Sequence, residues 1–165
     1  MARIMSFDVS SVSTGWALLD DNRLRSYGLI TRSIICDLSM AQKLFIFKKD
    51  AEQLLMKYKP DYVIIEETYM KNVKTLKTLM KFIGILQVAC YELLDCLEST
   101  LISPNTVRSY FKVKTKEDAF DFVTKKYNKT LKNLNFKSGN DITDAILQGL
   151  YLAQKLKEVE NNEEK

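Results

Sequence analysis

The sequence predicts an α/β fold with a mixed five-stranded sheet flanked by helices, and two observations support this prediction. Three short apolar segments within the first 31 residues are separated by turn residues, which is typical of antiparallel strands. Helical patterns then alternate with two more short apolar runs, as in strands joined by crossover helices. We expect one domain over residues 1–158 and a frayed acidic tail over residues 159–165.

The five strands are predicted from short apolar runs with turn residues between them. The first three are expected at residues 4–9, 16–19 and 24–30, and a polar hairpin turn joins the second to the third. The run at residues 62–65 is nearly continuous and rich in β-branched side chains, as expected of a central parallel strand. Residues 99–102 form a fifth, short strand, which should end at the following Pro-Asn.

Helices are expected at residues 37–58, 73–97 and 141–158, with another that begins at Thr115. In the first helix, apolar residues recur at helical spacing: Ala41, Leu44, Phe45, Ala51, Leu54 and Leu55. Residues 133–140 are expected to form a polar, basic connection that ends in an N-cap, Asn140. The last helix should bury six apolar residues: Ile142, Ala145, Ile146, Leu150, Ala153 and Leu156.

The composition excludes several classes of catalytic site. The chain has no histidine, which excludes Ser-His-Asp and Cys-His catalysis, zinc fingers and imidazole general bases. The remaining hard oxygen donors favour Mg²⁺ or Mn²⁺ over zinc. The three cysteines, Cys36, Cys90 and Cys96, have no paired spacing and are expected to be reduced, buried thiols of a cytoplasmic protein. No apolar run approaches the roughly 18 residues that span a membrane, so no membrane partner is expected.

Four acids stand at the ends of predicted core elements: Asp8, Glu66, Asp141 and Asp144. Asp141 and Asp144 are three residues apart, which places both carboxylates on one face of a helix, and Gln148 and Tyr151 continue that stripe. If the helix packs near Asp8 and Glu66, four carboxylates converge and repel each other unless a cation neutralises them. Two Mg²⁺ ions roughly 3.5–4 Å apart would do so, and such a pair can hydrolyse a phosphodiester.

Each acid also has a simpler structural explanation. Asp8 could cap a turn, the Glu66-Glu67 pair could be the exposed end of a strand, and Asp141 could favour a helix N-terminus through the helix macrodipole. Taken singly, these explanations are the better ones. Taken together, and beside basic segments, the acids favour a metal site.

Basic residues gather in two segments of the chain. Lys71, Lys74, Lys77 and Lys81 form one stripe along the helix that follows Glu66, and residues 108–137 hold nine basic residues against three acids. This density is typical of a polyanion-binding surface that contacts phosphates. An ordinary solvated lysine surface is the alternative.

Three ordered segments resemble the RuvC family of Holliday junction resolvases, which belongs to the RNase H-like superfamily. Phe7-Asp-Val-Ser-Ser-Val-Ser-Thr-Gly15 is similar to the family's first-strand motif. Tyr62-Val-Ile-Ile-Glu-Glu-Thr-Tyr-Met70 resembles its strand-borne Ile-Glu followed by an aromatic-Met pair, and Asp141-Ile-Thr-Asp-Ala145 resembles its last-helix motif. One departure is Val9-Ser10, where the family usually has Pro-Gly.

The resemblance implies an RNase H-like fold and a structure-selective DNA endonuclease. It implies Asp8, Glu66, Asp141 and Asp144 as metal-binding catalytic acids, with Mg²⁺ as the cofactor and Mn²⁺ as a substitute. It also implies a homodimer that resolves four-way junctions by paired symmetric nicks, with the long helix after Glu66 in the interface. The resemblance also gives Tyr69 as a residue that stacks on bases, and a place in the core is the alternative. The predicted DNA contacts are Tyr69, Lys71, Lys74, Lys77, Lys81, Arg108, Lys112, Lys114 and Lys116.

Other functions stay open at this point. One is a general branched-DNA or RNase H-type nuclease without the symmetry of a resolvase. A junction-binding protein without catalytic activity is another, and a nucleotide-binding relative of the actin-like ATPases is a third. The expected location is the cytoplasm of a bacterium or of a phage-infected host, and a phage-encoded, divergent family member would fit the departures.

Overall fold

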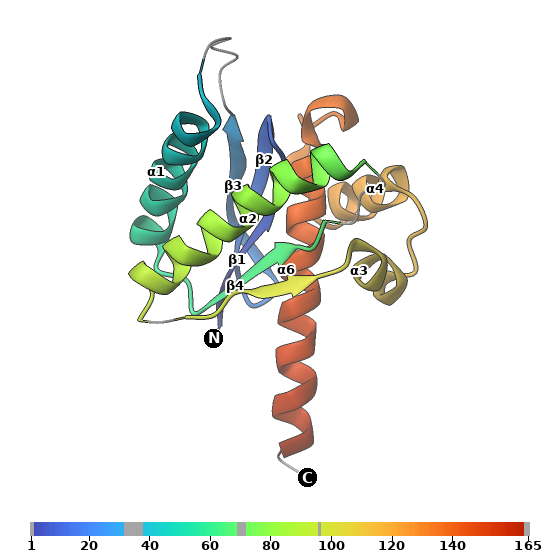
Figure 1. Ribbon diagram of the computed structural model, residues 1–165. Helices are drawn as coiled ribbons and strands as arrows, with labels where there is room; N and C mark the ends of the chain where they lie inside the picture. Colours follow the sequence, from blue (N-terminus) through green and yellow to red (C-terminus); the bar gives the residue numbers. More distant parts are fainter. Residues whose placement is uncertain (1, 32–37, 69–71, 96, 164–165) are drawn as a thin grey trace.

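The computed structural model describes residues 2–31, 38–68, 72–95 and 97–163 (Figure 1). Its sheet has five strands in the order β3-β2-β1-β4-β5. Strand β1 (Arg3–Asp8) pairs antiparallel with β2 (Ser13–Asp20), which pairs antiparallel with β3 (Arg23–Thr31). On its other side β1 pairs parallel with β4 (Tyr62–Glu66), and β4 pairs parallel with β5 (Thr100–Ile102). The predicted mixed sheet is therefore confirmed.

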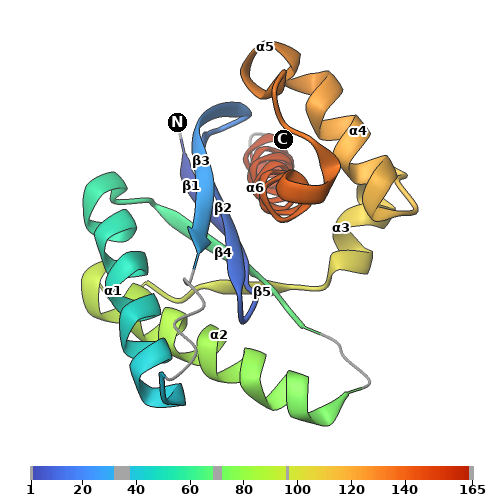
Figure 2. The same cartoon turned by 90° about the horizontal axis from the view of Figure 1, so that it is seen from above.

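Helices cover both faces of the sheet (Figure 2). Helices α1 (Met40–Tyr58) and α2 (Val73–Leu93) lie on one face. The other face carries α6 (Phe136–Glu163), with α3 (Pro104–Phe111), α4 (Lys116–Lys126) and the short α5 (Asn128–Leu131) packed outside it. Among the described residues no helix is both long enough and apolar enough to cross a membrane.

Side chains of the central strands alternate between two cores, as the period of a strand requires. Met5 and Phe7 of β1 pack into the core beneath α1 and α2. Ala17 and Leu19 of β2 pack into the core beneath α6. Strands β1 and β2 are therefore buried on both faces, and an acid placed at the end of such a strand is enclosed by the surrounding elements.

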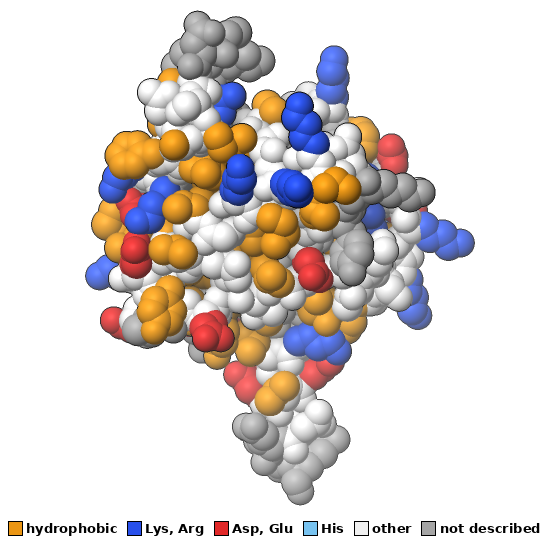
Figure 3. All heavy atoms as spheres, viewed as in Figure 1, with side chains coloured by type: hydrophobic (Ala, Val, Ile, Leu, Met, Phe, Trp, Pro, Cys, Tyr) orange, Lys and Arg blue, Asp and Glu red, His pale blue; other side chains and the backbone are white. Residues whose placement is uncertain are grey.

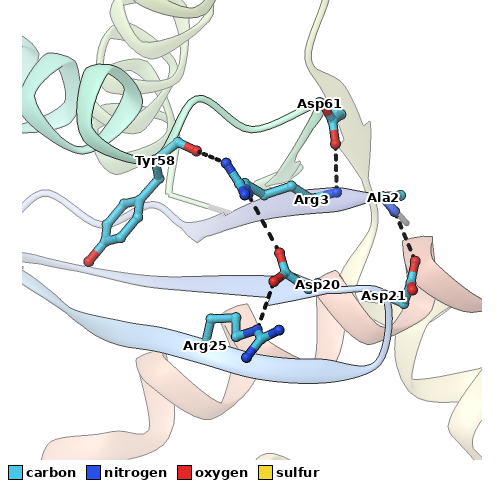
Figure 4. A network of polar contacts seen from close by, with 7 residues as sticks. All are labelled: Ala2, Arg3, Asp20, Asp21, Arg25, Tyr58 and Asp61. Atoms are coloured by element: carbon cyan, nitrogen blue, oxygen red, sulfur yellow. Dashed lines mark hydrogen bonds and ion pairs between the residues drawn. The ribbon is translucent and has the colours of Figure 1, made fainter.

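A polar network holds the amino-terminal end of β1 (Figure 4). The buried Asp20 carboxylate accepts a 2.7 Å hydrogen bond from Arg25 Nε, and Arg3 Nε lies 3.5 Å from its other oxygen. Arg3 also donates its backbone N–H to Asp61 at 2.7 Å and its Nη1 to the carbonyl of Tyr58 at 3.0 Å. Two arginines thus compensate the buried acid at this end of the sheet.

Trp16, the single tryptophan of the chain, lies on β2 and is 8% exposed. Its ring centroid lies 5.8 Å from that of Tyr58. Gly28 on β3 faces the indole, and a Cβ at that position would lie 3.0 Å from its Nε1. The absence of a side chain at Gly28 leaves room for the tryptophan ring.

Two helix starts differ from the prediction. Helix α1 begins at Met40 with a capping box from Ser39, and Asp37 lies outside the described residues. In α1, Ala41 and Phe45 are exposed and the buried aromatic is Phe47, so the predicted apolar stripe was wrong at Ala41 and Phe45. Helix α6 begins at Phe136 rather than Asp141, because the predicted connection is already helical there.

The structure also corrects the end of one predicted helix and adds two helices that were not predicted. Helix α2 ends at Leu93, before the predicted residue 97, and Asp95 follows with a positive φ of 49°. The Pro104-Asn105 pair does end β5, but the proline also occupies the first turn of a helix, α3, that was not predicted. The short α5 was not predicted either.

Two other sequence predictions agree with the described residues. Thr115 caps α4, at the predicted start of this helix, and Ala119 and Val123 of α4 are buried. Cys90 is a free, buried thiol, and burial raises its pKa to about 12. Cys36 and Cys96 lie outside the described residues.

Candidate active site

The candidate site lies at the carboxyl ends of two neighbouring parallel strands. Asp8 is the last residue of β1 and Glu66 is the last residue of β4. The strand register pairs Phe7 with Ile65, which sets the two acids side by side. The sequence places each acid directly after a buried apolar run, and the parallel pairing of these runs brings the acids together.

Helix α6 reaches this edge of the sheet because β2 has a glycine there. Gly15 is the partner of Asp8 in the antiparallel register. A Cβ on Gly15 would lie 2.1 Å from the carbonyl oxygen of Asp141, which is far inside van der Waals contact. Only glycine therefore allows the backbone of α6 to lie against β2 beside Asp8.

Three carboxylates converge in the space between β1, β4 and α6. One oxygen from each of Asp8, Glu66 and Asp144 lies within 4.8 Å of the other two. Asp8 is 7% exposed and Asp144 is 4% exposed. Asp141 is half-buried nearby, and its charge acts on Asp8, but it is not one of the three acids that meet within this distance. Its role as a ligand stays a prediction.

Burial and nearby negative charge favour the protonated forms of Asp8, Glu66 and Asp141. Burial raises the pKa of Asp8 well above its usual value, and the charges of Glu66 and Asp144 raise it further. Burial and the charge of Asp144 raise the pKa of Glu66 from 4.5 to about 7, although Lys116 and Arg108 oppose the change. Burial also raises the pKa of Asp141. Nearby positive charge would reverse these shifts.

Two cations from neighbouring helices contact the acids. Lys116 Nζ, at the start of α4, lies 3.0 Å from Asp144 Oδ2, and Arg108 Nη2 on α3 lies 3.8 Å from the same oxygen. Both residues were predicted as DNA contacts, and the structure places both against the acid cluster. The unpredicted helix α3 is what positions Arg108.

A glutamine orients one of the acids. Gln148 Nε2 donates a 2.8 Å hydrogen bond to Glu66 Oε2, and the Gln148 side chain is 1% exposed. Gln148 lies one turn after Asp144 on α6, where the predicted stripe from Asp141 continues. That stripe was the sequence signal for this residue, but no role was assigned to it.

The donor set fits a hard divalent cation. All three converging groups are carboxylates, the ligands that Mg²⁺ and Mn²⁺ prefer. Buried Asp144 Oδ2 has two cationic side chains, Lys116 and Arg108, as its ion-pair partners among the described residues. A divalent ion would supply the charge and the coordination that these oxygens lack.

The turn after Asp8 is closed by a serine side chain. The Ser10 hydroxyl accepts hydrogen bonds from the backbone N–H groups of Val12 at 3.2 Å and Ser13 at 3.3 Å. Val9 is 5% exposed and belongs to the core beneath α1 and α2. Val9-Ser10 thus makes a hydrogen-bonded turn where the RuvC family usually has Pro-Gly.

The predicted basic contacts on α2 are at the surface. Lys74, Lys77 and Lys81 are exposed on the amino-terminal half of α2, and Figure 3 shows Lys and Arg side chains gathered there. Lys112 and Lys114 are exposed in the segment between α3 and α4. Tyr69 and Lys71 lie outside the described residues, so their predicted roles are not tested.

Sequence comparison finds two similar curated proteins, both called crossover junction endodeoxyribonuclease RuvC. The protein from Fusobacterium nucleatum is 26% identical over 91 residues, which is 53% of this chain and 47% of the relative. The protein from Syntrophomonas wolfei is 29% identical over 87 residues, which is 51% of each. The matches thus span about half the length of these relatives, and no protein-family model matches the chain.

Solved structures extend the similarity to nearly the whole chain. Thermus thermophilus RuvC in complex with a Holliday junction substrate has a TM-score of 0.73 at 15% identity, with 91% of both chains covered. The chain thus resembles RuvC in sequence over about half of its length and in fold over nearly all of it. The yeast mitochondrial Holliday junction resolvase Ydc2 has a TM-score of 0.66 at 14% identity, over 97% of this chain and 82% of Ydc2. These likenesses agree with the predicted mixed five-stranded sheet, and they show that the fold of the chain is similar to that of RuvC and Ydc2.

Proposed function

We propose that this RuvC-like chain is a divalent-metal-dependent endonuclease that resolves four-way DNA junctions. The observation that carries the proposal is the convergence of Asp8, Glu66 and Asp144 at the carboxyl ends of β1 and β4. Support also comes from the two RuvC relatives and from the fold, which is shared with a Fowlpox virus resolvase solved with Holliday junction DNA (TM-score 0.57, 18% identity, 93% of this chain and 98% of that one).

Asp8, Glu66 and Asp144 would hold the metal, and Asp141 is the candidate for a fourth ligand. We favour Mg²⁺, with Mn²⁺ as a substitute. The metal would supply Lewis-acid stabilisation of the phosphodiester and an activated water. The chain itself contributes Gln148, which fixes the orientation of the Glu66 carboxylate. The proposed metal ligands are all carboxylates and include no imidazole, in agreement with the absence of histidine from the chain.

Lys116 and Arg108 have two roles in this proposal. In the metal-free protein they reduce repulsion among the acids by contacting Asp144. With the acids neutralised by metal, their charge would favour the phosphate and the negative charge that develops on it during cleavage. Lys74, Lys77, Lys81, Lys112 and Lys114, with Tyr69 and Lys71, are proposed to position the DNA.

Substitution of the metal-binding acids tests the proposal directly. We expect Asp8→Asn and Asp144→Asn to reduce nicking of a synthetic four-way junction in Mg²⁺ by more than about 100-fold, because each removes a ligand charge. Junction binding should persist or tighten, since the variants repel phosphate less. Gel assays of cleavage and binding measure both effects.

Glu66→Gln and Glu67→Gln form a matched pair for the same assay. They remove one charge from adjacent residues, but only Glu66 belongs to the acid cluster. Glu66→Gln should abolish nicking and Glu67→Gln should leave it within about 3-fold of the unaltered rate. An Asp8→Asn variant that cuts at full rate would exclude this metal site.

The pattern of cuts separates resolution from the remaining alternatives. Paired nicks at symmetry-related positions of an immobile junction indicate a resolvase that acts as a homodimer. Scattered single nicks indicate a general branched-DNA nuclease. Junction binding without cleavage in Mg²⁺ or Mn²⁺ indicates a non-catalytic binding protein.

A further inference from the structure

A second lysine-rich surface lies at the corner where α4 meets α5. Four exposed lysines stand there within eight residues: Lys125, Lys126, Lys129 and Lys132. None of these four makes an ion pair within the part of the chain that the structure describes, whereas Lys48, Lys49 and Lys155 each pair with a glutamate. Their positive charge is therefore available to a partner.

This corner is fixed to the body of the protein. Tyr127 donates its hydroxyl to the carbonyl of Asn22 at 2.7 Å, and Tyr27 on β3 donates its hydroxyl to the carbonyl of Thr130 at 3.2 Å. Leu131 of α5 is 2% exposed within the core beneath α6. The lysines thus stand on a rigid element, so binding would not have to order their backbone.

The corner lies one helix length from the acid cluster. Helix α4 begins at Lys116, which contacts Asp144, and ends at Lys126. Eleven helical residues rise about 16 Å. Successive phosphates of one DNA strand advance about 3.4 Å along the duplex axis, so the length of α4, laid along that axis, matches roughly four to five nucleotides of a strand.

The surface between the lysines has donors suited to a phosphate backbone. A hollow of about 510 Å³ at this corner is lined by Phe120, Asp121, Thr124, Lys125, Asn128, Leu131, Lys132 and Leu134. Ammonium, amide and hydroxyl donors there can contact phosphate oxygens. Asp121 is the one acid in this lining, and its charge opposes such contacts.

We propose that Lys125, Lys129 and Lys132 bind the backbone of a duplex arm as it leaves the acid cluster. Lys126 belongs to the same surface, but its ammonium lies over the Tyr127 ring, 5.9 Å from the centroid, next to the anchoring hydroxyl. The inference rests on the proposed function, because it takes the cleaved DNA as its partner. It adds an arm-binding site about four to five nucleotides from the point of cleavage.

The test compares two triple variants that remove the same charge. The first is Lys125→Gln, Lys129→Gln, Lys132→Gln. The control is Lys43→Gln, Lys57→Gln, Lys157→Gln, which changes lysines on α1 and at the far end of α6. Both are assayed for binding to junctions with arms of about 4 and about 15 base pairs, over a range of salt concentrations.

With long arms, the first variant should bind about 10-fold more weakly than the unaltered protein. Its slope of log K against log salt should be shallower by about 2 to 3, because each lost phosphate contact removes about 0.9. With short arms it should bind within about 2-fold of the unaltered protein. The control should match the unaltered protein on both junctions.

Asp121→Asn gives a second readout of opposite sign. Removing this acid should strengthen binding to long arms by about 2- to 5-fold, as expected when a like charge beside phosphate is lost. If both variants match the control in affinity and salt slope while the unaltered protein binds junctions, the arm site is excluded and the proposed function stands. If the unaltered protein neither binds nor cuts junctions, the proposed function itself is excluded.

Discussion

Glu66 shows how its neighbours set the chemistry of one carboxyl group. Burial and the charge of Asp144 raise its pKa to about 7, although Lys116, Arg108 and a hydrogen bond from Gln148 all act in the opposite direction. The buried Asp20, in contrast, is paired with two arginines. The positive charge near Asp20 is therefore contributed by two arginines, whereas the positive charge near Glu66 is too small to offset burial and the charge of Asp144.

This shift predicts an unusual pH dependence of stability. A carboxyl with a raised pKa binds protons more tightly in the folded protein than in the unfolded chain, so the free energy of unfolding falls as pH rises. For Glu66 the loss should occur between pH 4.5 and about 7 and amount to at most on the order of 3 kcal/mol. Asp8 adds to it in the same direction.

Urea unfolding at pH 5 and pH 8 measures this effect. With a chelator present, the protein should be less stable at pH 8, and Glu66→Gln should reduce the difference. Mg²⁺ should restore stability mainly at pH 8, where the ligands are ionised. Greater stability at pH 8 than at pH 5 in the chelator would contradict the assignment of a repulsive acid cluster.

The sequence predicted three of the converging residues, Asp8, Glu66 and Asp144, because acids at the ends of buried apolar runs are conspicuous. It did not predict that Lys116 and Arg108 would contact Asp144. That contact depends on how α3 and α4 pack beside α6, which local periodicity does not determine. The sequence pattern therefore contains no information on the long-range packing that creates these contacts.

The helix boundaries that were predicted wrongly involve residues that occur in more than one kind of local structure. Pro104 ends a strand but equally suits the first turn of a helix, and α3 begins there. Gly139 and Asn140 are poor helix formers, yet both lie inside α6. A Cβ on Gly139 would lie 2.3 Å from Leu134 Cγ, so close packing explains this glycine. Asn135 supplies the cap five residues before the predicted one, accepting from the Ser138 N–H at 3.1 Å.

The close contact between β2 and α6 at Gly15 leads to a prediction about stability and nicking. Gly15→Ala should reduce stability by about 2–3 kcal/mol or more and impair nicking, because the new methyl group would push the backbone of α6 away from β2. Gly84→Ala is the matched control, since a Cβ there has no neighbour within 4 Å and α2 gains a better helix former. Its stability should change by no more than about 1 kcal/mol, and upward. Thermal unfolding and nicking of both variants measure the difference, and equal effects would contradict it.

Across the whole molecule, the exposed face of α2 changes character along its length. Lys77 and Lys81 occupy its amino-terminal half, and Val88 and Tyr91, which are 47% and 53% exposed, continue the same face one and two turns after Gly84. Figure 3 shows basic and apolar side chains over this helix. The arrangement supports a homodimer joined through the apolar half of α2, with the basic half left for DNA.

Val88→Asp should convert such a dimer into monomers of 19.1 kDa, since it places a charge in the apolar half of the interface. Met56→Asp on α1 is the control, because Met56 is similarly exposed, at 53%, on another helix. Sedimentation velocity measures the mass of both variants, and the monomer should lose paired nicking. A dimer that tolerates Val88→Asp would place the interface elsewhere.

The single tryptophan allows the unfolding of the protein to be followed by fluorescence without a chemical label. Trp16 follows Gly15, whose backbone touches that of α6, and its indole packs beside Tyr58 on the other face of the sheet. Its fluorescence emission is therefore an intrinsic probe of this strand. Unfolding should shift the emission to longer wavelengths, because the buried ring then meets water. Since the chain has one tryptophan, the whole tryptophan signal comes from this position. Trp16 is the register partner of Phe7, the residue before Asp8, so its emission is the natural signal to test in metal titrations.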